Sequence, residues 1–213
     1  MKIISYYTKN TPYQAVAERF LIPSLEKFGL DSEVKEYEDK GSWGANTGIK
    51  SQFILETLLK YKEPVVFVDC DAEIVRPPTL LYQISEDVDI GYYHFNWYGH
   101  WRNQWENTTK IELLSGTMYF NYNEKVIGLL QEWIGKVQTN LNRWEQKVLE
   151  EIVYARTDLN IYKIPAEYCC VLKQDYSIPA YIKDPIIIHN QASRLFKRKQ
   201  NWEENLKKFR LDK

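Results

Sequence analysis

A short apolar run that ends in two carboxylates constrains the fold of this chain more than any other feature. Residues 65–71 read Val-Val-Phe-Val-Asp-Cys-Asp, and β-branched and aromatic residues in such a run are typical of a buried strand. The strand runs directly into Asp69 and Asp71. In open α/β sheets, ligands bind beyond the carboxyl ends of the strands. Carboxylates buried there are costly unless a cation or hydrogen-bond donors compensate for their charge.

These carboxylates indicate a divalent-cation site. Carboxylate oxygens suit Mg²⁺, Mn²⁺ or Ca²⁺, and such a cation would bridge a diphosphate. The alternative is that Asp69 and Asp71 only cap a turn or a helix N-terminus. A second apolar run, residues 186–188, ends in His189, whose imidazole would complete the coordination sphere. Taken alone, His189 is better explained as a surface histidine, and its likeness to the acidic strand end makes the two explanations about equal.

Strand and helix patterns alternate in the first half of the chain. Residues 2–7 and 33–37 are predicted strands, and helices are predicted over residues 12–29 and 47–61. This alternation predicts parallel pairing and a three-layer α/β domain. The remaining predicted strands are residues 87–93, 117–122, 161–164 and 185–189, and the remaining predicted helices are residues 125–137, 143–154 and 200–211.

The composition argues against several classes of function. The 213 residues carry a formal net charge of −1, which provides no overall field for nucleic acid. No apolar run approaches the roughly 20 residues that span a bilayer, and the first residues lack the pattern of a signal peptide. The three cysteines form a poor disulfide framework, so a cytoplasmic location is expected. We expect a single domain over residues 1–213.

Aromatic residues are concentrated in one segment. They make up 15% of the chain, and residues 92–105 contain seven of them in fourteen positions. We interpret this segment as a loop on which sugar rings stack, although Tyr92 and Phe95 are expected to belong to the core. Basic residues of the C-terminal helix, Lys207 and Lys208 among them, are compatible with peripheral contact to an anionic membrane, but docking of this helix on the core is favoured.

Three weaker signals lie further along the chain. Ser115 and Gly116 precede a predicted strand, and glycine there permits a ligand to approach the backbone, although a simple turn is the commoner cause. Glu145 begins a predicted helix, where an acidic residue also complements the helix dipole. Arg194 and Lys197 follow His189 and would neutralise phosphate oxygens; the alternative is a solvated basic run.

These pieces, in this order, resemble nucleotide-sugar-dependent glycosyltransferases of the GT-A fold, in particular the small retaining enzymes of the glycogenin and galactosyltransferase type. The matching parts are the Lys-bearing helix, the D-x-D strand, a Ser-Gly-x-x-x-Phe-Asn strand, the Glu-Gln pair and the late histidine with its basic residues. The resemblance implies a three-layer α/β/α, Rossmann-like fold with a mostly parallel central sheet. Residues 1–93 would be the nucleotide-binding half, residues 94–199 the half for the donor sugar and acceptor, and residues 200–213 a C-terminal helix.

The resemblance also implies the reaction and its participants. A sugar would pass from a nucleoside-diphosphate sugar, with a UDP-sugar favoured, to a hydroxyl group of a saccharide or another acceptor, with Mn²⁺ or Mg²⁺ as the cation. The implied metal ligands are Asp69, Asp71 and His189. The implied donor contacts are Tyr6, Thr8, Lys50, Asp69, Ser115, Gly116, Arg194 and Lys197. Glu145 and Gln146 would lie beside the reacting sugar, and Glu145 and Asp89 are the candidate bases if the reaction inverts the anomeric centre.

Two other classes of function are compatible with the same residues. Phosphatases of the haloacid-dehalogenase type also place D-x-D after an apolar strand and use the first aspartate, here Asp69, as the nucleophile. They normally carry that strand near the N-terminus and a Thr or Val two residues after the second aspartate, where this chain has Glu73. The other alternative is a non-catalytic sugar-binding module that uses the aromatic segment.

Overall fold

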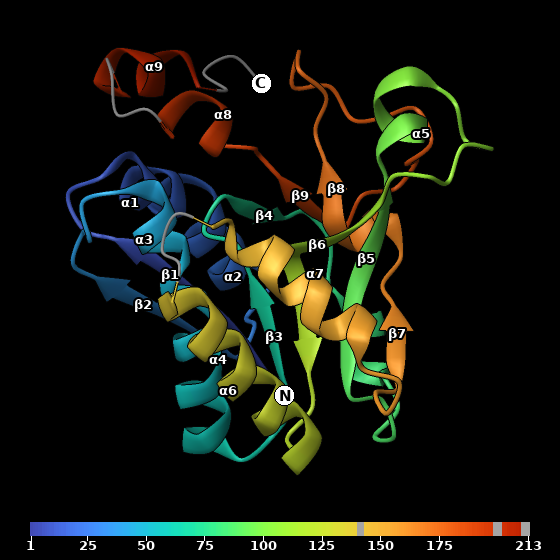
Figure 1. Ribbon diagram of the computed structural model, residues 1–213. Coiled ribbons are helices and arrows are strands. Elements are labelled where there is room, and N and C mark those ends of the chain that lie inside the picture. Colours follow the sequence, from blue (N-terminus) through green and yellow to red (C-terminus); the bar gives the residue numbers. More distant parts are fainter. Residues whose placement is uncertain (140–142, 198–201, 210–213) are drawn as a thin grey trace.

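The computed structural model describes residues 1–139, 143–197 and 202–209, which form an α/β structure around a six-stranded sheet (Figure 1). The strand order is β2-β1-β3-β6-β5-β7. The strands are β1 (Lys2–Thr8), β2 (Ser32–Tyr37), β3 (Val65–Val68), β5 (Ile90–Asn96), β6 (Ile111–Phe120) and β7 (Ile161–Lys163). The predicted strands are therefore present, and residues 65–68 are fully buried at the centre of the sheet.

The sheet is mostly parallel, as predicted, and only β6 of its strands is reversed. The segment between β5 and β6 contains only the six-residue helix α5 (Trp97–Arg102), which stays at one edge of the sheet (Figure 1). A parallel connection needs a longer crossover element that returns the chain to the opposite edge. The chain therefore re-enters the sheet at the edge it has just left, and β6 pairs antiparallel with both β3 and β5.

Three helices cover one face of the sheet (Figure 1). They are α4 (Ile49–Tyr61), α6 (Glu124–Thr139) and α7 (Glu145–Ala155). Phe67 and Phe120 of the sheet pack here against Phe53 of α4 and Trp133 of α6, and all four side chains are buried. Burial of each such side chain stabilises the fold by about 1.5–3 kcal/mol relative to exposure.

The opposite face is covered by a mixed layer. It contains the π-helical turn η1 (Ala17–Leu21), α2 (Ile22–Lys27) and a small sheet with the order β4-β9-β8. These short strands are β4 (Ala72–Ile74), β9 (Ile187–His189) and β8 (Cys170–Val171). Ile3 and Val66 point into this layer, whereas their neighbours Ile4 and Phe67 point into the other, as the alternation of a strand requires. The three-layer prediction is confirmed.

The aromatic segment is not the single loop that the sequence predicted. β5 extends to Asn96, and residues 97–102 form α5. The Asn96 side chain accepts a hydrogen bond from the Gly99 backbone N–H at 2.8 Å, which caps the helix. Gly99 has no room for a side chain, because a Cβ atom there would lie 2.2 Å from the Trp105 ring. Strand β6 also begins earlier than predicted, at Ile111, because residues 111–114 pair with β5 beyond an irregularity at Tyr92.

The C-terminal helix, α9 (Trp202–Lys208), docks on the rest of the protein, as the sequence analysis favoured. Phe209 is buried and contacts Phe20 and Phe196 edge-on, and Leu206 packs on the same cluster. The predicted helix residues 200, 201, 210 and 211 lie outside the described part of the chain. Within that part, no helix has the length and apolar character needed to cross a membrane.

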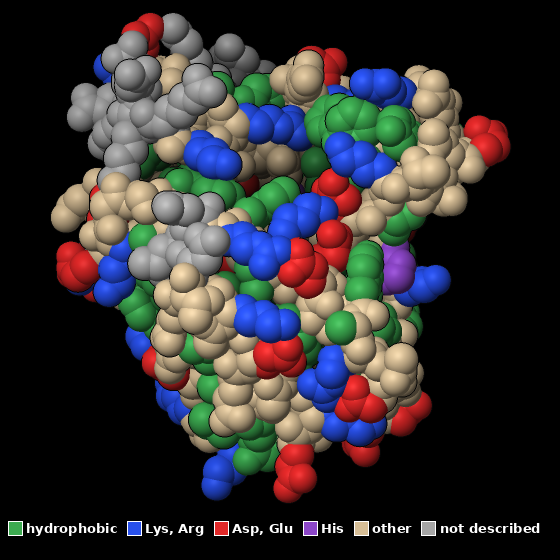
Figure 2. Space-filling view, in the orientation of Figure 1, with side chains coloured by type: hydrophobic (Ala, Val, Ile, Leu, Met, Phe, Trp, Pro, Cys, Tyr) green, Lys and Arg blue, Asp and Glu red, His purple; other side chains and the backbone are tan. Residues whose placement is uncertain are grey.

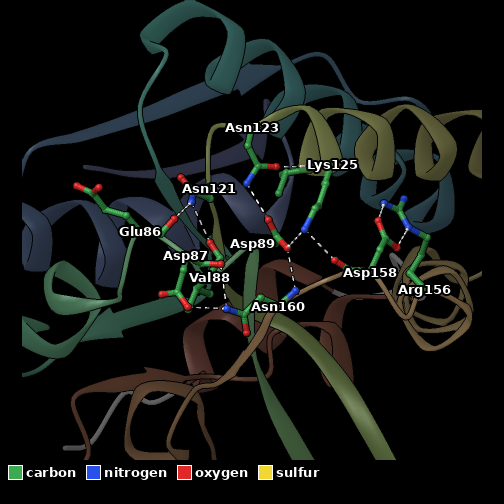
Figure 3. Close-up of polar contacts among 11 residues, drawn as sticks. Glu86, Asp87, Val88, Asp89, Asn121, Asn123, Lys125, Arg156, Asp158 and Asn160 are labelled. Carbon is green, nitrogen blue, oxygen red and sulfur yellow. Dashed lines mark hydrogen bonds and ion pairs between the residues drawn. The ribbon is translucent and has the colours of Figure 1, made fainter.

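Asp89 lies at the start of β5, on the edge of the sheet opposite to the carboxyl end of β3 (Figure 3). Its carboxylate accepts hydrogen bonds from the Asn123 side chain and from the Asn160 backbone N–H, both at 2.8 Å, and lies 3.4 Å from the Lys125 Nζ. These contacts join β5 to the beginnings of α6 and β7. Asp89 is therefore distant from the other candidate residues, and we assign it a structural role in place of the catalytic one considered above.

Replacement of Asp89 by alanine is expected to lower the free energy of unfolding by about 1–3 kcal/mol, because two partly buried donors lose their acceptor. Urea denaturation measures this change. Asp87→Ala is the matched control, since Asp87 accepts a bond from Asn160 at the exposed surface, and we expect a change below about 1 kcal/mol there. Loss of enzymatic activity in Asp89→Ala without loss of stability would contradict the structural assignment.

Candidate active site

A single cavity of about 290 Å³ lies along the edge of the sheet where β1, β3 and β5 end. Side chains from these strands, from β6 and β9, and from α3 (Trp43–Thr47), α4 and α7 line it. In the space-filling view, this face is hollowed between α5 and α8 (Ser193–Phe196), and basic side chains lie at the rim of the hollow (Figure 2). The cavity therefore occupies the position in which open α/β sheets bind ligands.

Asp69, Asp71 and His189 meet in this cavity. Their potential ligand atoms lie within 4.8 Å of one another. The antiparallel pairing of β4 with β9, in which Ala72 lies opposite His189, brings the two distant segments together. Two carboxylates and an imidazole form a donor set that suits Mn²⁺ or Mg²⁺.

The imidazole of His189 has a fixed orientation. Its Nε2 lies 2.8 Å from the Thr117 hydroxyl, and its Nδ1 faces Asp71 at 3.7 Å. The ring packs closely on Gly116, where a Cβ atom would lie 2.9 Å from the His189 Cε1. Gly116 therefore leaves room for the His189 ring, and it also lines the cavity. Its contact with the donor stays a prediction. Thr117 was not predicted as a site residue, although it directly follows the Ser-Gly pair that was.

The charges of this cluster depend on one another. The enclosing protein raises the pKa of Asp69, Lys50 opposes this effect, and Asp71 adds to it. Burial also disfavours the charge of Asp71, but the nearby His189 imidazole and the Ala192 N–H hold the pKa of Asp71 below its ordinary value. Burial disfavours the imidazolium form of His189, yet Cys169 and Asp71 raise its pKa to about 10. The cluster thus favours positive charge beside its carboxylates.

Lys50 connects the acidic cluster to the floor of the cavity. Its Nζ lies 2.9 Å from Asp69 Oδ1, 3.1 Å from Glu145 Oε1 and 3.0 Å from the Ser115 hydroxyl. Burial disfavours its charge, but Asp69 and Glu145 together raise the pKa of Lys50. Lys50 is therefore a permanently charged group that α4 places between two carboxylates.

Glu145 and Gln146 begin α7 and are both buried. Gln146 Oε1 accepts a hydrogen bond from the Ser115 backbone N–H at 3.0 Å, and the Trp133 indole donates to the Glu145 carbonyl at 2.9 Å. Glu145 Oε2 and Gln146 Nε2 have no hydrogen-bond partner among the described residues. Because buried polar atoms without partners are rare, these two indicate a polar ligand in the cavity.

The end of the cavity at β1 is walled largely by aromatic side chains. The Tyr6 hydroxyl donates to the Asn46 carbonyl at 2.9 Å, and the Thr8 hydroxyl lies 3.0 Å from that of Thr11. Tyr13, whose buried hydroxyl has no hydrogen-bond partner among the described residues, and Trp43 complete this end. Tyr6 and Thr8 thus lie where the sequence analysis expected a nucleoside base, and they offer it an aromatic, largely apolar wall.

Arg194 and Lys197 do not line the cavity, although Gln191 and Ser193 from the same segment do. The Arg194 guanidinium donates to the carbonyls of Leu172 and Lys173, both at 2.8 Å, and lies 5.1 Å from the centre of the Trp101 ring. Lys197 lies above the Trp43 ring, with its Nζ 4.0 Å from the ring centre. The structure therefore does not place these two side chains with the other candidate residues.

The chain matches the family model described as nucleotide-diphospho-sugar transferase over residues 15–201. No curated protein matches it. Solved structures with the same fold include a glycosyltransferase involved in glycosylation of the major capsid of PBCV-1, which has 16% identity and a TM-score of 0.68 over 97% of this chain and 98% of that one. Mouse xyloside xylosyltransferase 1 has 13% identity and a TM-score of 0.55 over 90% and 98% of the two chains.

The galactosyltransferase LgtC, solved with donor and acceptor sugar analogues, has 10% identity and a TM-score of 0.53 over 97% of this chain and 95% of that one. These structures share the GT-A fold, which the sequence analysis predicted. The family match covers most of the chain, including the acidic strand, the Ser-Gly strand and His189. The chain belongs to the nucleotide-diphospho-sugar transferase family and is a glycosyltransferase that uses a nucleotide-sugar donor.

Proposed function

We propose that this glycosyltransferase moves a sugar from a UDP-sugar to a hydroxyl group of a saccharide, with Mn²⁺ or Mg²⁺ bound by Asp69, Asp71 and His189. One observation carries the proposal: the three candidate ligands share a cavity with two buried, unpartnered polar atoms, those of Glu145 and Gln146. The match to the nucleotide-diphospho-sugar transferase family over residues 15–201 favours this reaction over a phosphatase and over a non-catalytic sugar-binding module.

The donor set fits such a cation, since carboxylate oxygens and one imidazole nitrogen lie within 4.8 Å of one another. When bound, the cation supplies positive charge that stabilises the departing diphosphate. Thr117 and Gly116 hold the His189 ring with Nδ1 toward Asp71. Backbone contacts hold Asp71, whose Oδ2 accepts a hydrogen bond from the Ala192 N–H at 2.8 Å. The chain therefore orients its ligands before any ion arrives.

The remaining residues bind and orient the donor. Tyr6 and Thr8 form the wall for the nucleoside base, at the end of the cavity beside β1. Glu145 Oε2 accepts, and Gln146 Nε2 donates, hydrogen bonds to hydroxyl groups of the transferred sugar, which satisfies both orphaned atoms. Lys50 keeps Asp69, Ser115 and Glu145 at fixed positions around that sugar. Preorganised groups of this kind lower the barrier because they need no rearrangement during the reaction.

A thermal-shift screen of nucleotide-sugars tests this proposal. At a ligand concentration of about 100 times Kd, binding adds about 2.7 kcal/mol to the free energy of unfolding, which raises Tm by roughly 5–10 °C for a chain of this size. We expect this shift with a UDP-sugar and MnCl₂ together, and a much smaller one when EDTA replaces the metal. Stabilisation by GDP- or ADP-sugars alone would overturn the base assignment, and no stabilisation by any donor would overturn the proposal.

A further inference from the structure

The cavity extends beyond the residues that are proposed to contact the donor. Along the sheet, the base wall lies on β1, the acidic cluster follows β3, and Ser115 lies on β6. The next strand in spatial order is β5, and the cavity continues toward it. Phe95, Trp97, Trp101, Glu112 and Leu114 line this far end. Because the donor sugar is proposed to lie at Ser115, the far end is where a second substrate reaches it.

The chemistry of the far end is that of a sugar-binding surface. Two tryptophans of α5, Trp97 and Trp101, form its aromatic wall and are partly exposed. Phe95, near the end of β5, lies opposite Glu112 of β6, and Leu114 of β6 lies opposite Tyr93. Glu112 supplies a carboxylate, which lies 3.6 Å from the Lys147 Nζ. Aromatic rings beside a hydrogen-bond acceptor complement a sugar, whose apolar face stacks while its hydroxyl groups donate.

Basic side chains hold the two tryptophans in place. Arg194 lies against Trp101 while its guanidinium bridges the carbonyls of Leu172 and Lys173, and Lys173 in turn donates to the His100 carbonyl. Lys110 lies above Trp97, with its Nζ 3.9 Å from the ring centre. These contacts tie α5 to the segment after β8. A wall fixed before binding loses less conformational entropy when a ligand docks on it.

We propose that Trp97, Trp101 and Glu112 form the acceptor subsite, and that the acceptor is a pyranoside. This inference rests on the proposed function. The acceptor ring stacks on the tryptophans and its hydroxyl groups donate to Glu112, whose charge is offset by Lys147. The acceptor oxygen forms a bond to the anomeric carbon as the bond from that carbon to the diphosphate oxygen breaks. The nucleoside diphosphate leaves with the bonding electron pair, and the hydroxyl proton passes to it or to water.

The test compares transfer with hydrolysis in the same protein, using a UDP-sugar that the thermal-shift screen identifies. The acceptor probes are methyl α- and β-pyranosides of glucose, galactose and xylose. For Trp97→Ala and Glu112→Ala, we expect the ratio of transfer to hydrolysis to fall by about tenfold to thirtyfold, mainly through the KM of the acceptor. Glu112→Gln keeps a carbonyl acceptor and should lose less. Tyr82→Ala, an exposed aromatic outside the cavity, is the matched control.

The outcomes separate this inference from the proposed function. The inference is overturned if no pyranoside accepts sugar while the UDP-sugar is hydrolysed. It is also overturned if the Trp97 and Glu112 variants keep the wild-type ratio. If the wild-type protein neither binds nor hydrolyses any UDP-sugar, the proposed function itself fails. Donor-induced thermal stabilisation shows that each variant is folded and binds the donor.

Discussion

Replacement of Asp71 by asparagine is expected to remove Mn²⁺-dependent binding of the UDP-sugar and to slow transfer by about a hundredfold to a thousandfold. Asparagine has the same shape, and its side-chain oxygen still accepts the hydrogen bond from the Ala192 N–H, so the loop after β9 keeps its anchor. The variant loses only the negative charge and one anionic ligand atom. The effect on binding therefore reports on the cation site and not on folding.

Isothermal titration calorimetry with MnCl₂ and the UDP-sugar measures this loss directly. The matched control is Asp184→Asn, which removes one charge from an exposed ion pair with Arg76, outside the cavity. We expect wild-type affinity in the control and no resolvable Mn²⁺ binding in Asp71→Asn. Wild-type affinity for both Mn²⁺ and the donor in Asp71→Asn would show that this carboxylate is not a ligand.

The central part of the fold was predictable because its signals are local. The apolar run at residues 65–68 is buried on both faces, and its composition shows this without any knowledge of its partners. The helices α4, α6 and α7 were found from their apolar periodicity. The direction of β6 was not predictable in the same way, since it depends on the edge of the sheet at which α5 lies. Of the small sheet, only β9 was predicted, within residues 185–189, because β4 and β8 have three and two residues and show no periodicity.

In the candidate site, too, the residues with local sequence signals were predicted, and those that depend on distant partners were not. Asp69, Asp71 and His189 each follow an apolar strand, so their meeting was predicted from the rule that ligands bind where strands end. Asp89 differs because it precedes its strand, and β5 is oriented like β3, so the two carboxylates lie at opposite edges of the sheet. The roles of Arg194 and Gly116 depend on partners distant in the sequence. The carbonyls of residues 172 and 173 and the His189 ring are such partners.

Replacement of Lys50 by methionine is expected to lower the free energy of unfolding by about 3–5 kcal/mol, because it leaves a buried carboxylate without a counter-charge. The side chains of Lys50 and Glu145 are 4% and 3% exposed, so water does not replace the lost ion pair. Asp69 is less affected, since 38% of its side chain is exposed to the cavity. Urea denaturation measures the loss.

A double variant separates the charge of Lys50 from its shape. If the Lys50–Glu145 pair is the main contribution, Lys50→Met with Glu145→Gln should be more stable than Lys50→Met alone, with a coupling energy of about 1–3 kcal/mol. Additive effects of the two substitutions would contradict the ion-pair argument. Activity should not recover with stability, because the double variant still lacks the ammonium that holds Asp69 and Ser115. Recovery of both would instead show that Lys50 acts only through the fold.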